Sequence, residues 1–302
     1  AVMVLVWVER KVTAAIQLRY GPMRTGKWGL AQTLADTLKL ILKEDIVPKK
    51  ADRMLFLFAP IIVFIPAYLT YLVLPVSPDL ITRDLNIGLF YFLAIPSISA
   101  LGLLMAGWGS NSKYPLIGGI RSAAQMVSYE IPRALSLLGI IMLAGTLSMT
   151  KLVELQNPYW FILLQPLGFI IFFISSLAEI NRIPFDIPVA ESELVQGYFT
   201  EYSGIRFALF QMAEYAHMVG VSLFLALIFL GGWHGPFLPS GVWLFLKTFF
   251  FILIFMWVGW TFPRFKAEQL MRICWKMLIP LALFNIAFTG ILMIVISNIV
   301  RT

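Results

Sequence analysis

Charged side chains are scarce in this 302-residue sequence: Asp, Glu, Lys and Arg supply 13% of the residues, and hydrophobic residues supply 60%. Soluble domains carry about 25% charged residues, and roughly half or less of each is apolar. The composition therefore excludes an ordinary water-soluble domain. It predicts a protein that lies mainly in lipid.

Cysteine and histidine are also nearly absent. Cys274 is the single cysteine, so this chain alone can build neither an internal disulfide nor an iron–sulfur cluster held by several thiolates. His217 and His234 are the two histidines, and they cannot supply the paired axial ligands of a bundle that holds two haems. We expect no metal site, and any electrons must be carried by a partner.

Gly/Ser-rich linkers, low-complexity stretches and repeats of fixed period are missing too, so we expect a single transmembrane domain, 1–302. Long apolar runs are abundant, and a helix that crosses a bilayer needs roughly 20 such residues. We predict an all-α integral membrane protein of about eight transmembrane helices plus amphipathic interfacial helices. The predicted spans include 53–74, 86–107, 120–146, 159–180, 206–231, 241–263 and 277–298.

The first eight residues, Ala1–Val8, are apolar but too short to cross a bilayer. They run directly into Glu9-Arg10-Lys11 with no small-residue cleavage site, so we interpret them as the end of a further span. A cleaved signal peptide is the weaker alternative. Because the sequence does not begin with Met, we expect that natural N-terminal residues precede Ala1.

Positive charge alternates from one loop to the next, and Lys and Arg near span ends stay on the cytoplasmic side. This pattern places both termini on the outer face. The net charge of +7 reflects this topology and attraction to anionic lipid, and it gives no argument for nucleic acid. The predicted cytoplasmic loops are 9–52, 108–119, 181–205 and 264–276.

Helical periodicity in the first loop predicts an amphipathic interfacial helix that lies flat against the bundle. From periodicity alone, a lipid-surface anchor and the lining of a ligand chamber are equally good interpretations. The predicted apolar face carries Leu30, Leu34, Leu38, Ile41 and Leu42, and the opposite face carries Gln32, Asp36, Lys39 and Lys43.

Carboxylates inside or at the ends of three predicted spans are the most informative residues, because a charge at the bilayer centre costs about 3 kcal/mol or more. Glu130, Glu179 and Glu214 come from three different spans. If they converge, they could exchange protons near neutral pH. Simpler interpretations remain open: Arg133 lies one turn after Glu130 and could pair with it, and capping or snorkelling could explain each carboxylate singly.

The loop 181–205 is acidic on a face that is otherwise basic, and Pro184 and Pro188 stiffen it. A solvated acidic loop is the simple alternative to a functional one. On the same side, Arg19 and Arg264 lie beside aromatic residues and could hydrogen-bond a ligand carbonyl, although orientation anchoring explains them as well. The loop carboxylates are Asp186, Glu191, Glu193 and Glu201.

At these positions the sequence resembles the family formed by the H subunit of NADH-quinone oxidoreductase, whose mitochondrial counterpart is subunit 1 of respiratory complex I. The resemblance is ordered and extends over nearly the whole chain. The matching strings are Glu9-Arg10-Lys11, Gln17 to Pro22, Lys43-Glu44-Asp45, Ser128-Tyr129-Glu130, Asn181-Arg182, Pro184-Phe185-Asp186, Glu191-Ser192-Glu193-Leu194, Glu201-Tyr202-Ser203-Gly204, Ala213-Glu214-Tyr215 and Pro263-Arg264.

The resemblance implies a subunit of a proton-translocating enzyme, in which the chain and the hydrophilic arm enclose a chamber for quinone, the substrate. FMN and iron–sulfur clusters are then expected in partner subunits of the hydrophilic and membrane arms. A bacterial cytoplasmic membrane is the expected location, with a mitochondrial or chloroplast membrane as the alternative. The implied chamber residues are Arg10, Arg19, Asp36, Arg264 and Lys266. The implied proton path comprises Glu130, Glu179, Asp186, Glu191, Glu193, Glu201 and Glu214.

Three positions depart from the family pattern. Many members have an acidic residue near Val189, Asn or an apolar residue is common at His217, and Asp is frequent at Glu268. Two rival functions stay open. One is an autonomous secondary transporter, although neither inverted repeats nor broken paired helices are evident. The other is a homologous subunit of a ferredoxin- or hydrogenase-linked complex, which the shared motifs discriminate poorly.

Overall fold

A computed structural model describes residues 2–78, 80–189 and 191–301. This part of the chain contains helices and no β-strand, which confirms the predicted all-α membrane class. The longer helices are α1 (Val2–Ile16), α2 (Gln32–Leu42), α3 (Arg53–Leu69), α4 (Gly88–Gly109), α5 (Lys113–Ala144), α8 (Pro166–Glu179), α10 (Gly204–Phe229), α11 (Ser240–Thr261) and α13 (Ile279–Arg301). The shorter ones are α6 (Met149–Glu154), α7 (Phe161–Leu164), α9 (Glu191–Leu194) and α12 (Ala267–Ile273), with 3₁₀ turns η1 (Lys27–Gly29), η2 (Thr70–Val73) and η3 (Gly197–Phe199) and a π-turn η4 (Cys274–Leu278).

Among the described residues, 6 helices are long and apolar enough to cross a membrane, and they correspond to six of the seven complete predicted spans. The segment predicted at 159–180 is instead broken at Gln165, whose φ of −133° and ψ of 57° are not helical. Pro166 explains the break, because its ring disfavours a helical residue before it. The Gln165 side chain donates to Thr289 Oγ1 and accepts from Asn285 Nδ2, so α13 is hydrogen-bonded to the break.

Helices also extend into three segments that were predicted as loops. Helix α1 continues to Ile16, eight residues beyond the predicted span end, because no glycine or proline interrupts it. Between α4 and α5 the non-helical connection is only 110–112, and 267–276 are helical and continue through η4 into α13. Residues that sequence reasoning placed in loops, such as Glu9 and Arg10, therefore have fixed positions on a helix.

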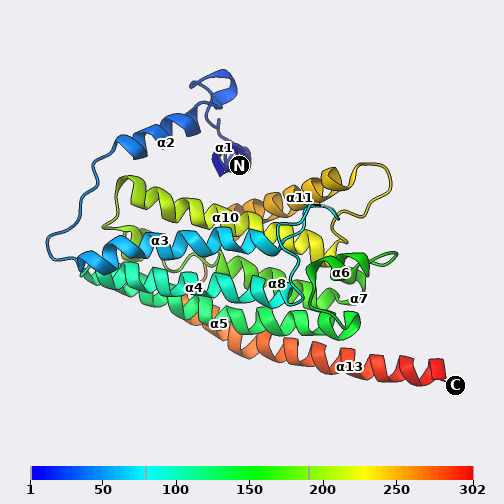
Figure 1. Cartoon of the computed structure of the whole chain (residues 1–302). Coiled ribbons are helices and arrows are strands. Elements are labelled where there is room, and N and C mark those ends of the chain that lie inside the picture. The colour runs from blue at the N-terminus through cyan, green and yellow to red at the C-terminus, as the bar shows by residue number, and fades with distance from the viewer. Residues whose placement is uncertain (1, 79, 190, 302) are drawn as a thin grey trace.

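Helices α3, α4, α5, α8 and α10 form the tightly packed centre of the molecule (Figure 1). Small residues allow close approach: a methyl group added at Gly102 would lie 3.0 Å from the Val63 backbone nitrogen. Helix α13 packs along α5 and extends past the bundle, while α11 packs on α10 and α1 on α11. The result is a bundle that is dense behind α10 and looser on the side of α1.

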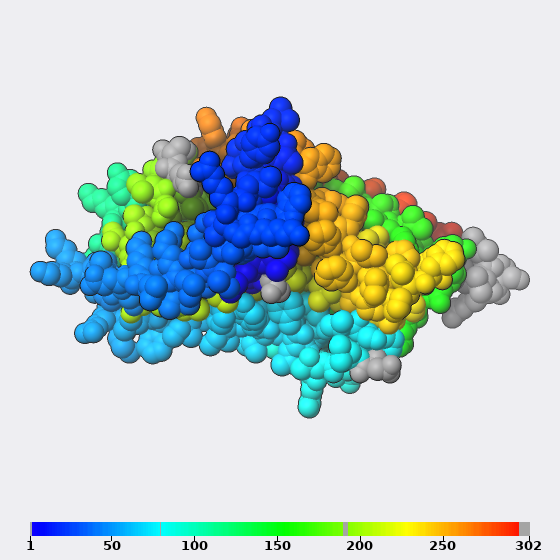
Figure 2. All heavy atoms as spheres, turned by 90° about the horizontal axis from the view of Figure 1, so that it is seen from above, coloured from blue at the N-terminus to red at the C-terminus, as the bar shows by residue number. Residues whose placement is uncertain are grey.

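Helix α2 confirms the predicted amphipathic helix, but only part of its predicted polar face turns toward the bundle, because Lys39 and Lys43 are exposed. Leu34, Leu38 and Ile41 of the apolar face are each more than half exposed, whereas Thr33 is buried. Together with α1, α2 lies across the outside of α10 and α11 (Figures 1 and 2). The two interpretations of this helix are therefore compatible, since one face is free to meet lipid while the other covers an internal space.

Candidate functional site: a large cavity and a buried ionisable network

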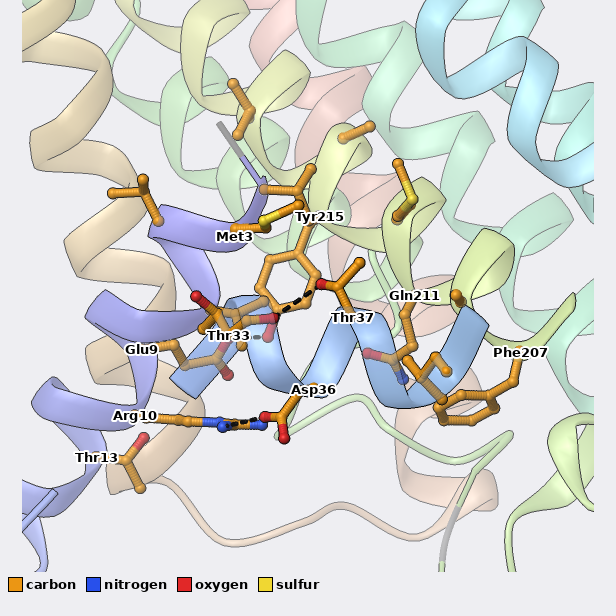
Figure 3. A pocket seen from close by; sticks show the side chains of 18 of the residues that line it. Met3, Glu9, Arg10, Thr13, Thr33, Asp36, Thr37, Phe207, Gln211 and Tyr215 are labelled. Carbon is orange, nitrogen blue, oxygen red and sulfur yellow. Dashed lines mark hydrogen bonds and ion pairs between the residues drawn. The ribbon is translucent and has the colours of Figure 1, made fainter. Parts of the chain in front are cut away.

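A cavity of about 1060 Å³ lies between α1, α2 and α10, and Tyr68 and Tyr71 also line it. Most of its lining is apolar, and its polar groups gather where Glu9, Arg10 and Asp36 come together (Figure 3). The lining residues are Val2, Met3, Val4, Val6, Glu9, Arg10, Thr13, Arg19, Thr33, Asp36, Thr37, Leu40, Tyr68, Tyr71, Phe207, Ala208, Gln211, Met212, Tyr215, Ala216, Val219 and Trp260.

Contacts near the middle of α2 and beyond its C-terminal end hold it as a cover over the cavity. Near the middle, Arg10 Nη1 pairs with Asp36 Oδ2 at 2.6 Å, so α1 and α2 are joined by charge. Beyond the C-terminal end, Arg206 Nη2 pairs with Asp45 Oδ2 at 2.8 Å. Gly204 has a φ of +58° and lies close to the Lys43 carbonyl, a position that favours glycine because any side chain would be strained. These contacts fix α2 in place above the cavity.

Three of the predicted chamber residues, Arg10, Arg19 and Asp36, line this cavity. Arg264 and Lys266 do not line it, so the structure does not bring them together with the other three. Both follow the end of α11, where Arg264 Nη2 pairs with Asp186 Oδ2 at 2.9 Å and Lys266 precedes α12. The chain between α11 and α12 therefore holds the acidic loop instead of the cavity wall.

Glu9 of α1 lines the cavity and also contacts two other segments of the chain, which supply Arg182 and Tyr215. Arg182 Nη1 contacts Glu9 Oε1 at 2.5 Å, and Tyr215 Oη donates a hydrogen bond to Glu9 Oε2 at 2.6 Å. The Arg182 guanidinium also lies 4.6 Å from the centre of the Tyr215 ring. Burial opposes the charge on Arg182, but Glu9, Tyr215 and Glu214 outweigh it and raise the Arg182 pKa above its ordinary value. Arg182 is thus a permanent cation.

The next members of the network are Tyr198 and Glu214. Tyr198 is 1% exposed and its Oη donates to Glu214 Oε1 at 3.2 Å. Burial raises the Tyr198 pKa well above its ordinary value, and the negative charges of Glu214 and Asp186 raise it further. The phenol therefore remains a donor at physiological pH.

Close backbone packing fixes the position of Tyr198. A methyl group added at Gly118 of α5 would lie 2.9 Å from the Tyr198 backbone nitrogen, so only glycine permits this approach. The start of the acidic loop is fixed by Gln125 of α5, whose Nε2 donates to the carbonyls of Ala178 and Phe185, each at 2.7 Å. Helix α5 therefore holds the loop at both places.

Deeper in the bundle, Arg133 forms an ion pair with Glu179. The Arg133 side chain is 1% exposed and that of Glu179 is 10% exposed, so the pair is almost dry. The ion pair of Arg133 is thus made between helices α5 and α8, while Glu130, which helical spacing suggested as its partner, acts on Arg133 through its charge without a direct ion pair in the described residues. Glu130 is partly buried one turn earlier on α5. A cavity of about 20 Å³ adjoins both Glu179 and Glu214.

The remaining predicted carboxylates of the loop lie in different surroundings. Glu193 Oε2 pairs with Arg121 Nη1 at 2.7 Å, and its side chain is 57% exposed. Glu201 is partly buried in the turn that precedes α10. Glu191 begins α9, but its side chain lies outside the described residues. The described geometry thus pairs Glu179 with Arg133, Asp186 with Arg264 and Glu214 with Tyr198, and it leaves Glu193 at the surface.

Sequence reasoning gave no role to Glu9, Arg182, Tyr198 or Tyr215, and it considered Arg133 only as a partner of Glu130. Glu9, Arg182 and Tyr215 lie inside quoted motifs, whereas Tyr198 lies outside them. The available signal was an ionisable or phenolic side chain in an otherwise apolar setting.

Comparison with known proteins decides the family. The family model described as NADH dehydrogenase matches residues 1–290, which include every residue of the cavity and the network. The chain belongs to this family. It is 50% identical over 295 residues to the second of the NADH-quinone oxidoreductase H subunits of Syntrophobacter fumaroxidans, covering 95% of this chain and 89% of that one.

Other members of the NADH dehydrogenase family are similarly close. The NADH-quinone oxidoreductase H subunit from Chlorobaculum parvum is 50% identical over 310 residues, covering 95% of this chain and 86% of that one. The H subunit of the same enzyme from Bacillus cytotoxicus is 48% identical over 289 residues, covering 94% and 87%. These relatives confirm the resemblance carried by the motifs. Within the described residues, no group of three or more His, Cys, Asp or Glu is placed to hold a metal ion.

Proposed function

We propose that this chain is the membrane subunit of a proton-translocating NADH-quinone oxidoreductase and forms the membrane-side wall of its quinone chamber. The relatives are named as the H subunit of that enzyme, and the chain shares about half of its residues with them over nearly its whole length. Electrons reach the quinone from iron–sulfur clusters and FMN in partner subunits, because one cysteine cannot hold a cluster. The bacterial cytoplasmic membrane is the proposed location.

The large cavity suits an apolar molecule with a polar headgroup. Its volume of about 1060 Å³ is at the upper end of ligand sites, which are mostly apolar with a few placed polar groups. Alkyl and aromatic side chains such as Met3 and Phe207 suit a quinone tail, while Arg10 and Gln211 supply donors for a quinone carbonyl. Helix α2 would cover the bound molecule.

One observation carries the proposal: Glu9 and Tyr215 line the cavity and are also members of the buried network. Reduction of a quinone to a quinol takes up two electrons and two protons, so it changes the charge and the hydrogen bonds at the headgroup. A change of charge at the headgroup acts on Glu9, and through the charge of Arg182 it acts on Glu214. Glu179 lines the same small cavity as Glu214 and is affected in turn. A chain of close, poorly screened charges is a physical route for that coupling.

The test compares Glu214→Gln and Glu130→Gln with Glu193→Gln in the assembled complex in vesicles. The first two replace carboxylates of the buried part of the proposed path, and the third replaces an exposed carboxylate paired with Arg121. We expect proton pumping per quinone reduced to fall in the first two variants and to remain unchanged in the third. Normal pumping by both Glu214→Gln and Glu130→Gln would overturn the proposed path.

A further inference from the structure

The buried network has a gap between Glu214 and Glu179. Within the described residues, no direct hydrogen bond or ion pair joins these two carboxylates: Glu214 accepts from Tyr198, and Glu179 pairs with Arg133. Both nevertheless line one small cavity enclosed by α3, α4, α5, α8 and α10 and the turn η3. A connection between them therefore has to cross this cavity.

The small cavity has the size and the polarity to hold one water molecule. Its volume is about 20 Å³. One water needs at least about 10–15 Å³ and two to four polar partners. The apolar part of the lining is buried, and the polar part is Ser99, Glu179, Asn181, Tyr198, Glu214 and His217. A water at this place can hydrogen-bond to groups from both sides of the gap.

His217 is well placed to complete the connection. It follows Glu214 by three residues on α10, so both side chains lie on the same face of the helix. Its Nε2 lies 3.3 Å from the Oγ of Ser99, which is 1% exposed on α4. An imidazole can accept a proton at one nitrogen and release one from the other, which neither an amide nor an alkyl side chain can do.

We propose that His217, with one water held in the small cavity, forms the link by which protons pass between Glu214 and Glu179. This inference rests on the proposed function of the network. In the step a proton leaves the carboxyl group of Glu214, passes through the water and the imidazole, and reaches the carboxylate of Glu179. Only O–H and N–H bonds form and break, so no oxidant or reductant is required. Arrival of the proton weakens the attraction between Glu179 and Arg133, which carries the change on to α5.

The test uses His217→Leu and His217→Asn in the assembled complex in vesicles. Both variants are expected to assemble and to reduce quinone at the normal rate when the membrane is uncoupled. Coupled pumping in His217→Leu should fall by roughly tenfold, less than the usual loss of a proton-transfer group, because Glu214 and the water site are retained. His217→Asn should recover part of the pumping, since its amide holds the water but cannot exchange protons.

Two serine variants distinguish an effect of the small cavity from a general effect of lost packing. Ser99→Ala removes a cavity hydroxyl, whereas Ser222→Ala removes an equally buried hydroxyl that donates to the Met218 carbonyl within α10. We expect Ser99→Ala to lower the rate of pumping and to raise its solvent deuterium sensitivity, because proton transfer becomes slower, and Ser222→Ala to leave both unchanged. Equal effects from the two substitutions would overturn the link.

Glu214→Gln, assayed in parallel, separates this inference from the proposed function. If Glu214→Gln abolishes pumping while His217→Leu pumps normally, the network stands and the role of His217 fails. If Glu214→Gln also pumps normally, the link fails, and if Glu130→Gln pumps normally as well, the proposed path fails with it. A redox-induced infrared change in the carboxyl stretching region that is present in the parent and lost in His217→Leu would support the link independently of pumping.

Discussion

The charges beside the large cavity and those behind it differ in how much water they meet. The side chains of Arg10 and Asp36, which join α1 to α2, are 43% and 28% exposed, whereas Arg133 and Glu179 are 1% and 10% exposed. A partly hydrated pair is screened and can rearrange around a ligand at little cost. A dry pair is costly to break, because either partner alone would be an unpaired buried charge. The comparison separates a side suited to binding from a side suited to transmitting charge.

The largest effect is expected from Arg133→Met, which leaves Glu179 without its cation. Removing one partner of a buried ion pair costs about 3–5 kcal/mol of stability. We expect a large fall in the thermal unfolding midpoint of the purified complex and in the amount assembled. The double variant Arg133→Met with Glu179→Gln should regain much of this loss, because neither position of the pair then carries a charge. If the single variant unfolded like the parent, the description of this pair as dry would be wrong.

A smaller effect is expected from Tyr198→Phe, which removes the donor to Glu214 and costs about 1–3 kcal/mol, because a buried acceptor then loses its partner. The Tyr198 pKa is raised in the folded protein above the ordinary value of 10.0. The folded state thus retains the proton more strongly, and this contribution to stability is complete below pH 10 and decreases above it. The parent should lose stability more steeply than Tyr198→Phe above pH 10, as measured by thermal unfolding against pH.

Tyr202 provides the control for that alkaline titration. Burial raises its pKa too, but its hydroxyl donates to the Phe56 carbonyl and does not contact a carboxylate. Tyr202→Phe should therefore also reduce the alkaline loss of stability while leaving proton pumping unchanged. Tyr198→Phe should change both. If the two variants could not be distinguished by pumping, the hydrogen bond between Tyr198 and Glu214 would have no part in coupling.

The contrast between exposed and buried charges also explains how much of the structure could be predicted from the sequence. Apolar runs located the long helices, because hydrophobic length determines a membrane span directly. The break at Gln165 was missed although Pro166 signals it, because the run 159–180 remained apolar on both sides of the proline. Glu9 and Arg10 were assigned to a loop, since a span was expected to end at the first charges. Helix α1 continues there because no glycine or proline interrupts it, and Glu9 is paired with Arg182.

Pairing across helices was the part that the sequence could not supply. Helical spacing suggested Glu130 as the partner of Arg133, but in the structure Arg133 forms its ion pair with Glu179 of another helix. The contact between Arg182 and Glu9 joins residues that are 173 positions apart. Such contacts depend on which helices are neighbours. Local periodicity does not show which helices are neighbours. The carboxylates were therefore identified from the sequence without the cations and phenols that contact them.

The smallest effect on stability is expected at the hydrated pair of Arg10 and Asp36. Asp36→Asn should change the free energy of unfolding by less than about 1 kcal/mol, as is usual for partly exposed ion pairs. It should nevertheless raise the KM for quinone, because the pair holds α2 over the large cavity. Arg121→Gln, which breaks the exposed pair with Glu193, is the control and should change neither quantity, because neither of these two residues lines that cavity. If Asp36→Asn left the KM unchanged while the complex assembled normally, α2 would be no more than a surface helix. A KM effect without a loss of stability would show that the hydrated side of the molecule binds and the dry side supports the structure.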